Sequence, residues 1–582
     1  MTILLATFLA FITPKVFVDP QIISSIQQNG SADILCILKT SNKDLHSITK
    51  SFETKNKMGD FVFHTLKKEA DNSQDKLKWY LNSKKIEFSS FYIVNALHIP
   101  SASAELVNYL SLQPEVERLE YNATYKLQRP FIESDDLNKL ELRSPLATGW
   151  GILKIKADSL WALGFKGKGA VIGGEDTGVE LVSLLKANYR GTLENGYNHN
   201  YNWHDAIHSL NPLNNDANQN EFNNPCGLDT LAPCDDDNHG THTMGTMNAE
   251  GFEIGVAPEA KWMACRCMER GWGSPASYIE CFEFFLAPTD LGNKNPDPHK
   301  APHVINNSWG CPKEEGCDSS NFKTMEQVVK NLKAAGIFVT ASAGNSGAAG
   351  CRTINEPAAI FESSFSVGAT NIGDSIAGFS SKGPVTIDGT NRLKPNISAP
   401  GVGVISVVKN GSLASFSGTS MAGPHVCGAV ALLISAIPQL AGKVDLIEQI
   451  LEQAAEPKTT KILCGLDQSS SVPNNTYGFG RLDVYKAYLL AKQIISTGNS
   501  SLPSISRLIV YPNPSPGNYL FELKGTDIIS SINVYDANGH LILVKRNLSD
   551  SLIQITLKKI PGIYYYNVIS NSATFSGKLI EY

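Results

Sequence analysis

The chain has 582 residues, of which 42% are hydrophobic and 18% are charged, and its formal net charge is −6. This composition supports a large buried core and argues against a disordered chain, while the slight acidic excess argues against a general nucleic-acid binder. At about 150 residues per domain, the length suggests roughly four units. No apolar run reaches about 18 residues, so we expect no transmembrane segment. The 11 cysteines are too few for a disulfide-framework mini-protein, and their odd number leaves at least one unpaired within the chain.

The chain begins with an apolar stretch over residues 2–12. Its length is typical of the core of a secretory signal, so we expect residues 1–19 to be a signal peptide. No basic residue precedes the stretch and no clear cleavage site follows it. A buried N-terminal strand or helix is therefore the alternative.

Residues 20–127 have the alternating pattern of a small α+β domain. Strands are expected at residues 33–38, 91–97 and 116–121, and helices at residues 60–83 and 103–112. The segment that follows, around residues 135–143, is polar and charged. Such a segment suits an exposed linker in which proteolytic cleavage can occur.

The middle of the chain alternates strand-like apolar runs with helical ones. Strands are expected at residues 170–174, 261–268, 303–308, 336–342 and 364–369, and helices at residues 321–335 and 421–437. This order predicts an α/β fold, in which a parallel sheet is sandwiched by helices. Functional residues of such open sheets lie at strand ends and helix starts.

The last part of the chain consists of short segments with period-two alternation, separated by Gly, Pro and Asn turns. Strands are expected at residues 508–511, 532–535, 540–544 and 563–568. We expect residues 507–582 to form a small antiparallel β-sandwich, preceded by a Ser-rich linker over residues 496–506.

Three short motifs in the middle of the chain carry chemistry. They are Glu175-Asp176-Thr177-Gly178, Asn238-His239-Gly240-Thr241-His242, and Gly418-Thr419-Ser420-Met421. Asp-Thr-Gly alone also occurs in aspartic proteases, but these need two such loops and no second copy is placed to serve. His239 and His242 could hold a metal on one helix face, but no HExxH pattern or carboxylate partner supports zinc.

Taken together, in the order Asp, His, Ser, the three motifs resemble the subtilase family of serine endopeptidases. Further motifs, such as Gly255-Val256-Ala257-Pro258 and Lys394-Pro395-Asn396, make the resemblance strongest to the bacillopeptidase F-like group. The resemblance implies a subtilisin-like peptidase domain over residues 150–495. It also implies that residues 20–127 are an inhibitory propeptide, followed by a processing region over residues 128–149. A stably attached α+β domain is the alternative for residues 20–127.

The resemblance assigns each catalytic position a role. Ser420 would be the nucleophile, and His239 the base that takes its proton and returns it to the leaving amine. Asp176 would fix the tautomer of the His239 ring and stabilise its charged form. Asn345 would donate its side-chain amide to the oxyanion, together with the backbone N–H of Ser420. The reaction needs no cofactor.

Two further segments match the family's substrate-binding walls. Ser308, Trp309 and Gly310 would form the edge that pairs with the peptide backbone. Ala343 and Gly344 would line the other side of the primary pocket, although Trp309 could instead be a core aromatic. Residues 308–310 and 341–344 contain no Asp or Glu, so we expect broad cleavage with an apolar preference rather than dibasic processing. A non-catalytic peptide-binding protein on the same scaffold is the second hypothesis, and the four filled catalytic positions argue against it.

Some residues depart from the family pattern. Glu175, beside Asp176, would either raise the pKa of His239 or point to solvent. An insertion over residues 211–237 contains an acidic triplet, residues 235–237, for which a solvated loop is the main expectation and structural calcium the alternative. Pro424 is acceptable only if it lies in the first turn of its helix.

The cysteines allow two local disulfides in a secreted protein. The candidate pairs are Cys226 with Cys234 and Cys311 with Cys317. Cys265 and Cys267 are too far apart along a strand to bond easily. Cys36 would leave with the propeptide, so the odd cysteine count would belong to the precursor alone.

The C-terminal segment resembles the sorting domain of the type IX secretion system, through Tyr511-Pro512-Asn513-Pro514, Tyr535-Asp536, and Gly577-Lys578-Leu579-Ile580. An accessory β-sandwich is the alternative. The resemblance implies that the secretion machinery is a partner and that the protein is extracellular or at the cell surface. We therefore expect three folded domains after a short leader, and a mature N-terminus between residues 135 and 151.

Overall fold

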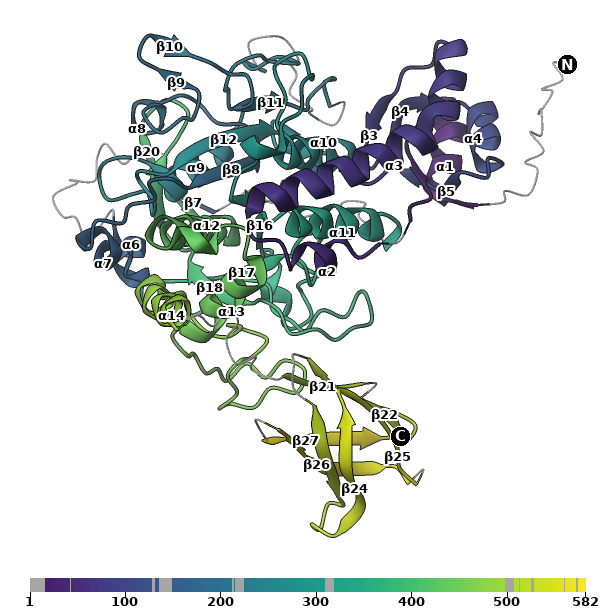
Figure 1. Ribbon diagram of the computed structural model, residues 1–582, viewed down its shortest axis with the longest axis vertical. Coiled ribbons are helices and arrows are strands. Elements are labelled where there is room, and N and C mark those ends of the chain that lie inside the picture. Colours follow the sequence, from purple (N-terminus) through teal and green to yellow (C-terminus); the bar gives the residue numbers. More distant parts are fainter. Residues whose placement is uncertain are drawn as a thin grey trace, which may run out of the picture. The chain divides into compact units, whose positions relative to one another are not determined.

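The computed structural model describes residues 16–41, 43–127, 131–134, 149–211, 214, 224–308, 319–497, 507–511, 513–524, 528–558, 560–571 and 574–582. The expected signal peptide lies outside these residues. The chain divides into two compact units, Met1–Lys492 and Gln493–Tyr582. Figure 1 shows the elements of both units, which are described separately.

The N-terminal part of the first unit, residues 16–127, is labelled the pro-domain here only after the expectation stated above. It is an α+β fold around a five-stranded sheet with the order β1-β5-β2-β4-β3. Its strands are β1 (Phe17–Val18), β2 (Ala32–Leu38), β3 (Ser89–Phe91), β4 (Ala96–Ala102) and β5 (Val116–Tyr121), and its helices are α1 (Pro20–Asn29), α2 (Leu45–Thr49), α3 (Lys55–Ser83) and α4 (Ala104–Ser111). The Thr54 side chain accepts a hydrogen bond from Lys57 N and so caps α3. The expected strand over residues 91–97 is instead a turn between β3 and β4, in which Asn95 takes a positive φ of 51°.

The rest of the first unit is built on a seven-stranded parallel sheet with the order β11-β12-β8-β15-β16-β17-β18. Its strands are β8 (Val171–Asp176), β11 (Trp203–Asp205), β12 (Lys261–Arg266), β15 (Val304–Asn307), β16 (Phe338–Ser342), β17 (Phe365–Thr370) and β18 (Ile397–Pro400). Helices α9 (His239–Asn248) and α12 (Thr419–Ala436) pack against each other and against the sheet, and α10 (Pro275–Leu286) packs with α11 (Ser319–Ala334). The predicted α/β fold with a parallel sheet is confirmed.

Two small antiparallel sheets join the pro-domain side of the chain to the peptidase part. One has the order β13-β14-β6 and the other β19-β20-β7. Their strands are β6 (Tyr125–Lys126), β7 (Phe131–Ser134), β13 (Met268–Glu269), β14 (Trp272–Gly273), β19 (Val404–Val407) and β20 (Leu413–Ser417). The remaining elements are α6 (Trp150–Ile155), α7 (Ala157–Ala162), α8 (Ser183–Lys186), β9 (Thr192–Leu193), β10 (Gly196–Tyr197), η2 (Pro298–Lys300), η4 (Gly347–Ala349), η5 (Pro438–Leu440), α13 (Val444–Ala454) and α14 (Val484–Ser496).

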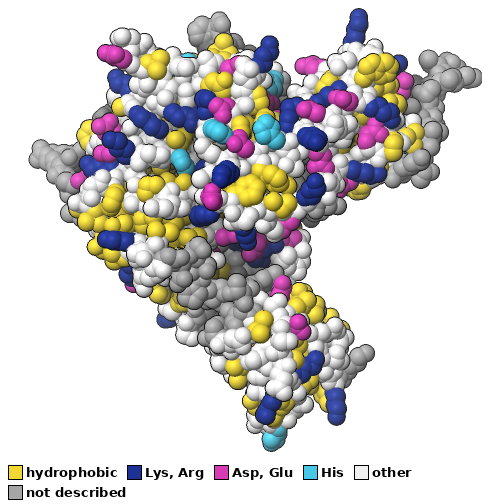
Figure 2. All heavy atoms as spheres, viewed as in Figure 1, with side chains coloured by type: hydrophobic (Ala, Val, Ile, Leu, Met, Phe, Trp, Pro, Cys, Tyr) yellow, Lys and Arg dark blue, Asp and Glu magenta, His cyan; other side chains and the backbone are white. Residues whose placement is uncertain are grey.

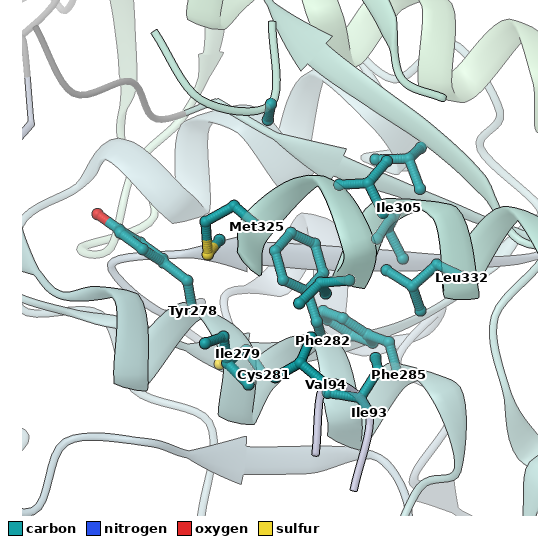
Figure 3. Packing of buried hydrophobic residues seen from close by; sticks show 14 of the residues in the cluster. Ile93, Val94, Tyr278, Ile279, Cys281, Phe282, Phe285, Ile305, Met325 and Leu332 are labelled. Carbon is teal, nitrogen blue, oxygen red and sulfur yellow. The ribbon is translucent and has the colours of Figure 1, made fainter. Parts of the chain in front are cut away.

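One hydrophobic core is shared by the pro-domain and the peptidase part. Ile93 and Val94, from the turn between β3 and β4, lie beside Phe282 and Phe285 of α10 and Leu332 of α11 (Figure 3). These side chains are all buried. Burial of apolar area stabilises an interface at about 25 cal/mol per Å², so this contact holds the pro-domain against the pair of helices α10 and α11.

Three disulfides are present among the described residues. Cys226–Cys234 confirms one candidate pair, and Cys265–Cys281 and Cys351–Cys464 were not expected. Cys265 joins β12 to α10, and the neighbouring Cys267 is free, as are Cys36 and Cys427. The candidate pair Cys311 and Cys317 lies outside the described residues.

One helix among the described residues is long and apolar enough to pass a test for a membrane span, namely α12. Its residues are 89% buried inside the fold, so α12 is a core helix of this unit. On the face of the molecule in Figure 2, Lys and Arg side chains lie interspersed with Asp and Glu. Mixed charge of this kind agrees with the small net charge of the sequence.

The second unit contains two antiparallel sheets, with the orders β21-β22-β25 and β24-β23-β26-β27. Its strands are β21 (Arg507–Tyr511), β22 (Asn518–Lys524), β23 (Ile529–Tyr535), β24 (Leu541–Asp550), β25 (Leu552–Thr556), β26 (Gly562–Ser570) and β27 (Thr574–Glu581). Inward-facing residues of both sheets, such as Phe521, Ile532 and Val568, form one buried cluster.

Candidate active site

The candidate catalytic residues come from three separate elements. Asp176 is the last residue of β8, His239 is the first residue of α9, and Ser420 is the second residue of α12. All three side chains are buried. Parallel strands end at one edge of a sheet, where ligand sites of α/β folds lie.

Asp176 and His239 form a direct pair. His239 Nδ1 lies 2.7 Å from Asp176 Oδ1. The same carboxylate accepts a hydrogen bond from Thr177 N at 2.7 Å and one from Thr243 Oγ1 at 3.2 Å. These contacts hold the carboxylate in place, so the ring carries its proton on Nδ1 and leaves Nε2 as the basic nitrogen.

Ser420 lies at the N-terminal end of α12 and exchanges two hydrogen bonds with Ser308. Ser420 Oγ donates to the Ser308 carbonyl at 3.1 Å, and Ser308 Oγ donates to the Ser420 carbonyl at 3.0 Å. His239 Nε2 has no hydrogen-bond partner in the described part of the chain. The Ser420 hydroxyl would therefore have to rotate toward His239 before it could transfer its proton.

Pro424 explains why the Ser420 carbonyl is available to Ser308. The expectation that Pro424 lies in the first turn is wrong, because α12 begins at Thr419 and Pro424 lies inside the helix. Proline has no N–H, so it cannot donate to the carbonyl four residues earlier, which is that of Ser420. The Ser308 hydroxyl supplies the missing donor.

Asn345 lies in the loop after β16, and its side chain contacts the residue before Ser420. Asn345 Oδ1 accepts hydrogen bonds from Thr419 N and Thr419 Oγ1, both at 2.9 Å. The amide oxygen is thereby occupied, and the Nδ2 hydrogens remain as donors. The arrangement suits a side chain that donates to a developing oxyanion beside Ser420.

Electrostatics favour a charged His239. Burial alone lowers the pKa of His239, but the Asp176 carboxylate, through its charge and its hydrogen bond, outweighs burial, and the pKa is raised overall. Asp237 and Asp235 add to the rise. The net effect stabilises the imidazolium that forms when the ring takes a proton.

Glu175 does not point to solvent, as one expectation had it, because its side chain is completely buried. Neither carboxyl oxygen has a hydrogen-bond partner among the described residues. Burial and the neighbouring Asp176 raise the pKa of Glu175 well above the ordinary value. This environment favours the neutral form of the Glu175 carboxyl, which carries no second negative charge beside Asp176.

Asp235 and Asp236 of the acidic triplet before His239 are buried and Asp237 is half-buried, so the expectation of a solvated loop is wrong. Asp235 accepts hydrogen bonds from Thr177 Oγ1 at 2.9 Å and Thr241 Oγ1 at 2.6 Å. Asp236 pairs with the buried Arg266 at 2.6 Å. These bonds tie the end of the insertion to the loop after β8 and to β12, next to the start of α9. No group of three or more His, Cys, Asp or Glu side chains within the described ranges could hold a metal ion.

The expected substrate-binding walls are described in part. Ala343 N donates to Val367 O at 3.0 Å, and Gly344 N donates to Thr419 Oγ1 at 3.2 Å. Gly344 has a φ of +99°, a conformation that favours glycine. Trp309 and Gly310 lie outside the described residues, so only Ser308 of the opposite wall can be placed.

Sequence reasoning missed two strand pairings, that of β6 with β14 and that of β7 with β20. β6 pairs antiparallel with β14, with Tyr125 opposite Gly273, and Leu127 N donates to Gly271 O at 2.6 Å. β7 pairs antiparallel with β20, and Phe131 lies opposite Ser417, three residues before Ser420. The alternation in Phe131-Ile132-Glu133 is too short to have predicted a strand.

Comparisons with known proteins agree with this geometry. The family described as the subtilase family matches residues 167–480. The chain belongs to the subtilase family. It is 36% identical to bacillopeptidase F of Bacillus subtilis (strain 168) over 73% of this chain and 28% of that protein. It is also 30% identical to subtilisin DY of Bacillus licheniformis, over 50% of this chain and 86% of the relative.

The chain thus spans about a quarter of bacillopeptidase F but most of subtilisin DY. A third relative, the thermophilic serine proteinase of Bacillus sp. (strain AK1), is 34% identical over 38% of this chain and 48% of its own length. These relatives support a serine endopeptidase. The predicted resemblance of the tail is also confirmed, because a secretion system C-terminal sorting domain matches residues 509–581.

Proposed function

We propose that this subtilase is an exported serine endopeptidase that hydrolyses peptide bonds with Asp176, His239 and Ser420. The observation that carries the proposal is the buried His239–Asp176 pair, 2.7 Å apart, at the start of helix α9, which packs against the helix α12 that begins with Thr419 and Ser420. Ser420 Oγ attacks the scissile carbonyl while His239 Nε2 takes its proton. His239 then protonates the leaving amine, and water hydrolyses the acyl-enzyme by the same route.

Asn345 Nδ2 and the backbone N–H of Ser420 hold the oxyanion of the tetrahedral intermediate. Removal of one such donor costs about 100-fold to 1000-fold in kcat in serine proteases. The N-terminal end of α12 adds the positive potential of its helix dipole. The Ser308 carbonyl, which now accepts from Ser420 Oγ, releases the hydroxyl when substrate enters.

The protein is made as a zymogen that its own pro-domain inhibits. Support comes from β6 and β7, which pair with β14 and with β20, the strand that ends three residues before Ser420. Further support comes from polar contacts away from the site. The Glu283 carboxylate accepts hydrogen bonds from Tyr92 N at 2.6 Å and Ile93 N at 2.9 Å, and Asn331 Nδ2 donates to Ile93 O at 2.6 Å.

Self-cleavage then falls between the two strands, after Leu127 and before Phe131. This position is earlier than the mature N-terminus between residues 135 and 151 that linker polarity favours. N-terminal sequencing of the secreted protein separates the two positions directly.

Cleavage specificity is broad with an apolar preference, since the described pocket residues Ser308, Ala343 and Gly344 carry no charge. One observation favours cleavage after basic residues instead. The buried Glu356 carboxylate lies 3.4 Å from the position that a Cβ on Gly344 would occupy. A peptide-library digest distinguishes broad cleavage from cleavage after basic residues. Strict cleavage after Lys or Arg would reject the broad specificity.

A fluorophosphonate probe tests the catalytic proposal itself. We expect the mature secreted protein to be labelled at Ser420 and the Ser420→Ala variant to remain unlabelled. Absence of labelling in folded, processed protein would reject the peptidase and leave the peptide-binding scaffold as the function.

A further inference from the structure

A buried lysine lies behind the loop that carries Asn345. Lys382 is 3% exposed, and its ammonium donates hydrogen bonds to three backbone carbonyls. These are Gly347 O at 2.9 Å, Ser380 O at 3.1 Å and Gly378 O at 3.5 Å. A lysine ammonium has three N–H donors, so this carbonyl cage accounts for all of them.

The segment from Gly378 to Lys382, which we call the strap, also holds the loop through other atoms. Ser381 N donates to Gly344 O at 2.9 Å, and Ser346 N donates to Ser381 Oγ at 3.0 Å. Gly347 N donates to Phe379 O at 2.6 Å. The two backbones are in direct contact, because a Cβ on Gly347 would lie 1.9 Å from Ser380 O.

These contacts fall on both sides of Asn345. The strap binds Gly344 before it, and Ser346 and Gly347 after it, while the Asn345 side chain accepts hydrogen bonds from Thr419. A donor to an oxyanion must be held within about 0.5 Å of its productive position. The strap is therefore placed to set the position of the Asn345 backbone, and Thr419 sets the direction of its amide.

A buried lysine is energetically unfavourable at this position if its side chain only fills space. Burial of a charged group costs free energy unless its hydrogen bonds are made, and burial lowers the pKa of Lys382. An apolar side chain would fill the space without this cost, but it could not bind the Gly347 carbonyl. The charged ammonium of Lys382 therefore contributes its hydrogen bond to the Gly347 carbonyl.

We propose that Lys382, as the anchor of the strap, is a positioning residue for the oxyanion donor Asn345. This inference rests on the proposed peptidase function. Lys382 does not touch the substrate. It acts on the reaction through Asn345 alone, and this dependence separates a positioning role from a general effect on stability.

The test measures the rate at which the full chain cleaves itself, in a pulse-chase experiment. We expect Lys382→Met to slow self-cleavage about tenfold or more and Asn345→Ala to slow it about 100-fold or more. In the Asn345→Ala background, Lys382→Met should slow self-cleavage by less than about a further twofold, because the side chain that Lys382 positions is already gone. Lys461→Met, at an exposed lysine, is the matched control and should change neither rate. With processed protein and a peptide substrate, kcat should fall and KM should stay within about threefold.

An equal slowing by Lys382→Met in both backgrounds would overturn the proposal, as would a rate like that of the Lys461→Met control. If Lys382→Met does not fold, Ser381→Ala carries the same cycle, since it removes the acceptor of Ser346 N and leaves the lysine in place. The Ser420→Ala precursor tests the underlying function separately. If that precursor still cleaves itself, the peptidase proposal fails, whatever Lys382 does.

Discussion

The carbonyl of Ser420 is held by a side chain because the helix cannot hold it. Pro424 provides no N–H, and Ser308 Oγ donates in its place at 3.0 Å. A buried carbonyl without a partner costs about 1–3 kcal/mol. We expect Ser308→Ala to destabilise the protein by about 1–2 kcal/mol.

The effect of Ser308→Ala should shrink in a Pro424→Ala background, where residue 424 regains an N–H for the Ser420 carbonyl. Thermal unfolding measures the cycle, in a Ser420→Ala form that cannot digest itself. Equal losses with and without Pro424 would show that the Ser308 hydroxyl does not serve this carbonyl.

Glu175 makes stability depend on pH. Folding raises its pKa, through burial first and Asp176 second. A carboxyl with a raised pKa contributes stability that is fully present below its ordinary pKa and is lost as pH rises through the folded value. Glu175→Gln, which cannot ionise, should therefore gain in melting temperature relative to the wild-type protein as pH rises from 5 to 9.

The two proteins should have similar melting temperatures at pH 4, where the carboxyl is protonated in both states. Glu87→Gln, at an exposed glutamate, is the control for a change of net charge. A melting-temperature difference that does not grow with pH would mean that Glu175 is ionised in the folded protein.

At the scale of elements, the sequence predicts those helices and strands that have a regular pattern of apolar residues. The apolar runs that become β8, β12, β15, β16 and β17 are visible because central parallel strands are buried on both faces. Helix α9 was not among the helices expected from periodicity, since its residues are all buried and it shows no amphipathic period. Asp176, His239, Ser420 and Asn345 were found from motifs, whereas Lys382 lies 37 residues from Asn345 in sequence and its role depends on tertiary contact alone.

The disulfides also show that contacts between residues far apart in the sequence cannot be predicted from local patterns. Cys226–Cys234 was predictable because its sequence separation is 8, but Cys351–Cys464 has a separation of 113. Pairing at that distance depends on the fold, and no local pattern indicates it.

The long-range disulfide should also stabilise more. In the chain-entropy account, a loop of this length contributes about 5 kcal/mol and the short one about 2.5 kcal/mol. We therefore expect the double variant Cys351→Ser/Cys464→Ser to lose more stability than Cys226→Ser/Cys234→Ser, by thermal unfolding in the Ser420→Ala form. An equal or smaller loss would show that native-state effects outweigh loop closure here.

At the scale of the whole molecule, the proposed zymogen requires that the pro-domain leave the peptidase part after self-cleavage. The contacts that hold the pro-domain include the shared core around Ile93 and Val94. They also include the Glu283 carboxyl group, which accepts a hydrogen bond from Ile93 N. Glu283→Ala should weaken this hold by about 1–2 kcal/mol, because it removes the acceptor of the Tyr92 and Ile93 backbone N–H groups. Release after self-cleavage should then come earlier.

The measurement is the lag between precursor cleavage and hydrolysis of an added peptide, which should shorten several-fold. Glu87→Ala, at an exposed position of the same domain, should leave the lag unchanged. A lag that is unchanged in Glu283→Ala would mean that the apolar core alone sets the rate of release.

We expect export to depend on a different part of the chain. The sorting domain matches residues 509–581, and the second compact unit has its own buried cluster. A peptidase that keeps its own core should fold without that unit, since each unit buries its apolar residues separately. We expect deletion of residues 507–582 to retain the protein in the cell while leaving its active site competent. Fractionation reports the first effect, and fluorophosphonate labelling of the retained protein reports the second. Secretion of the truncated chain at the full-length level would show that the tail does not direct export, whereas retained but unlabelled protein would show that the peptidase part needs the tail to fold.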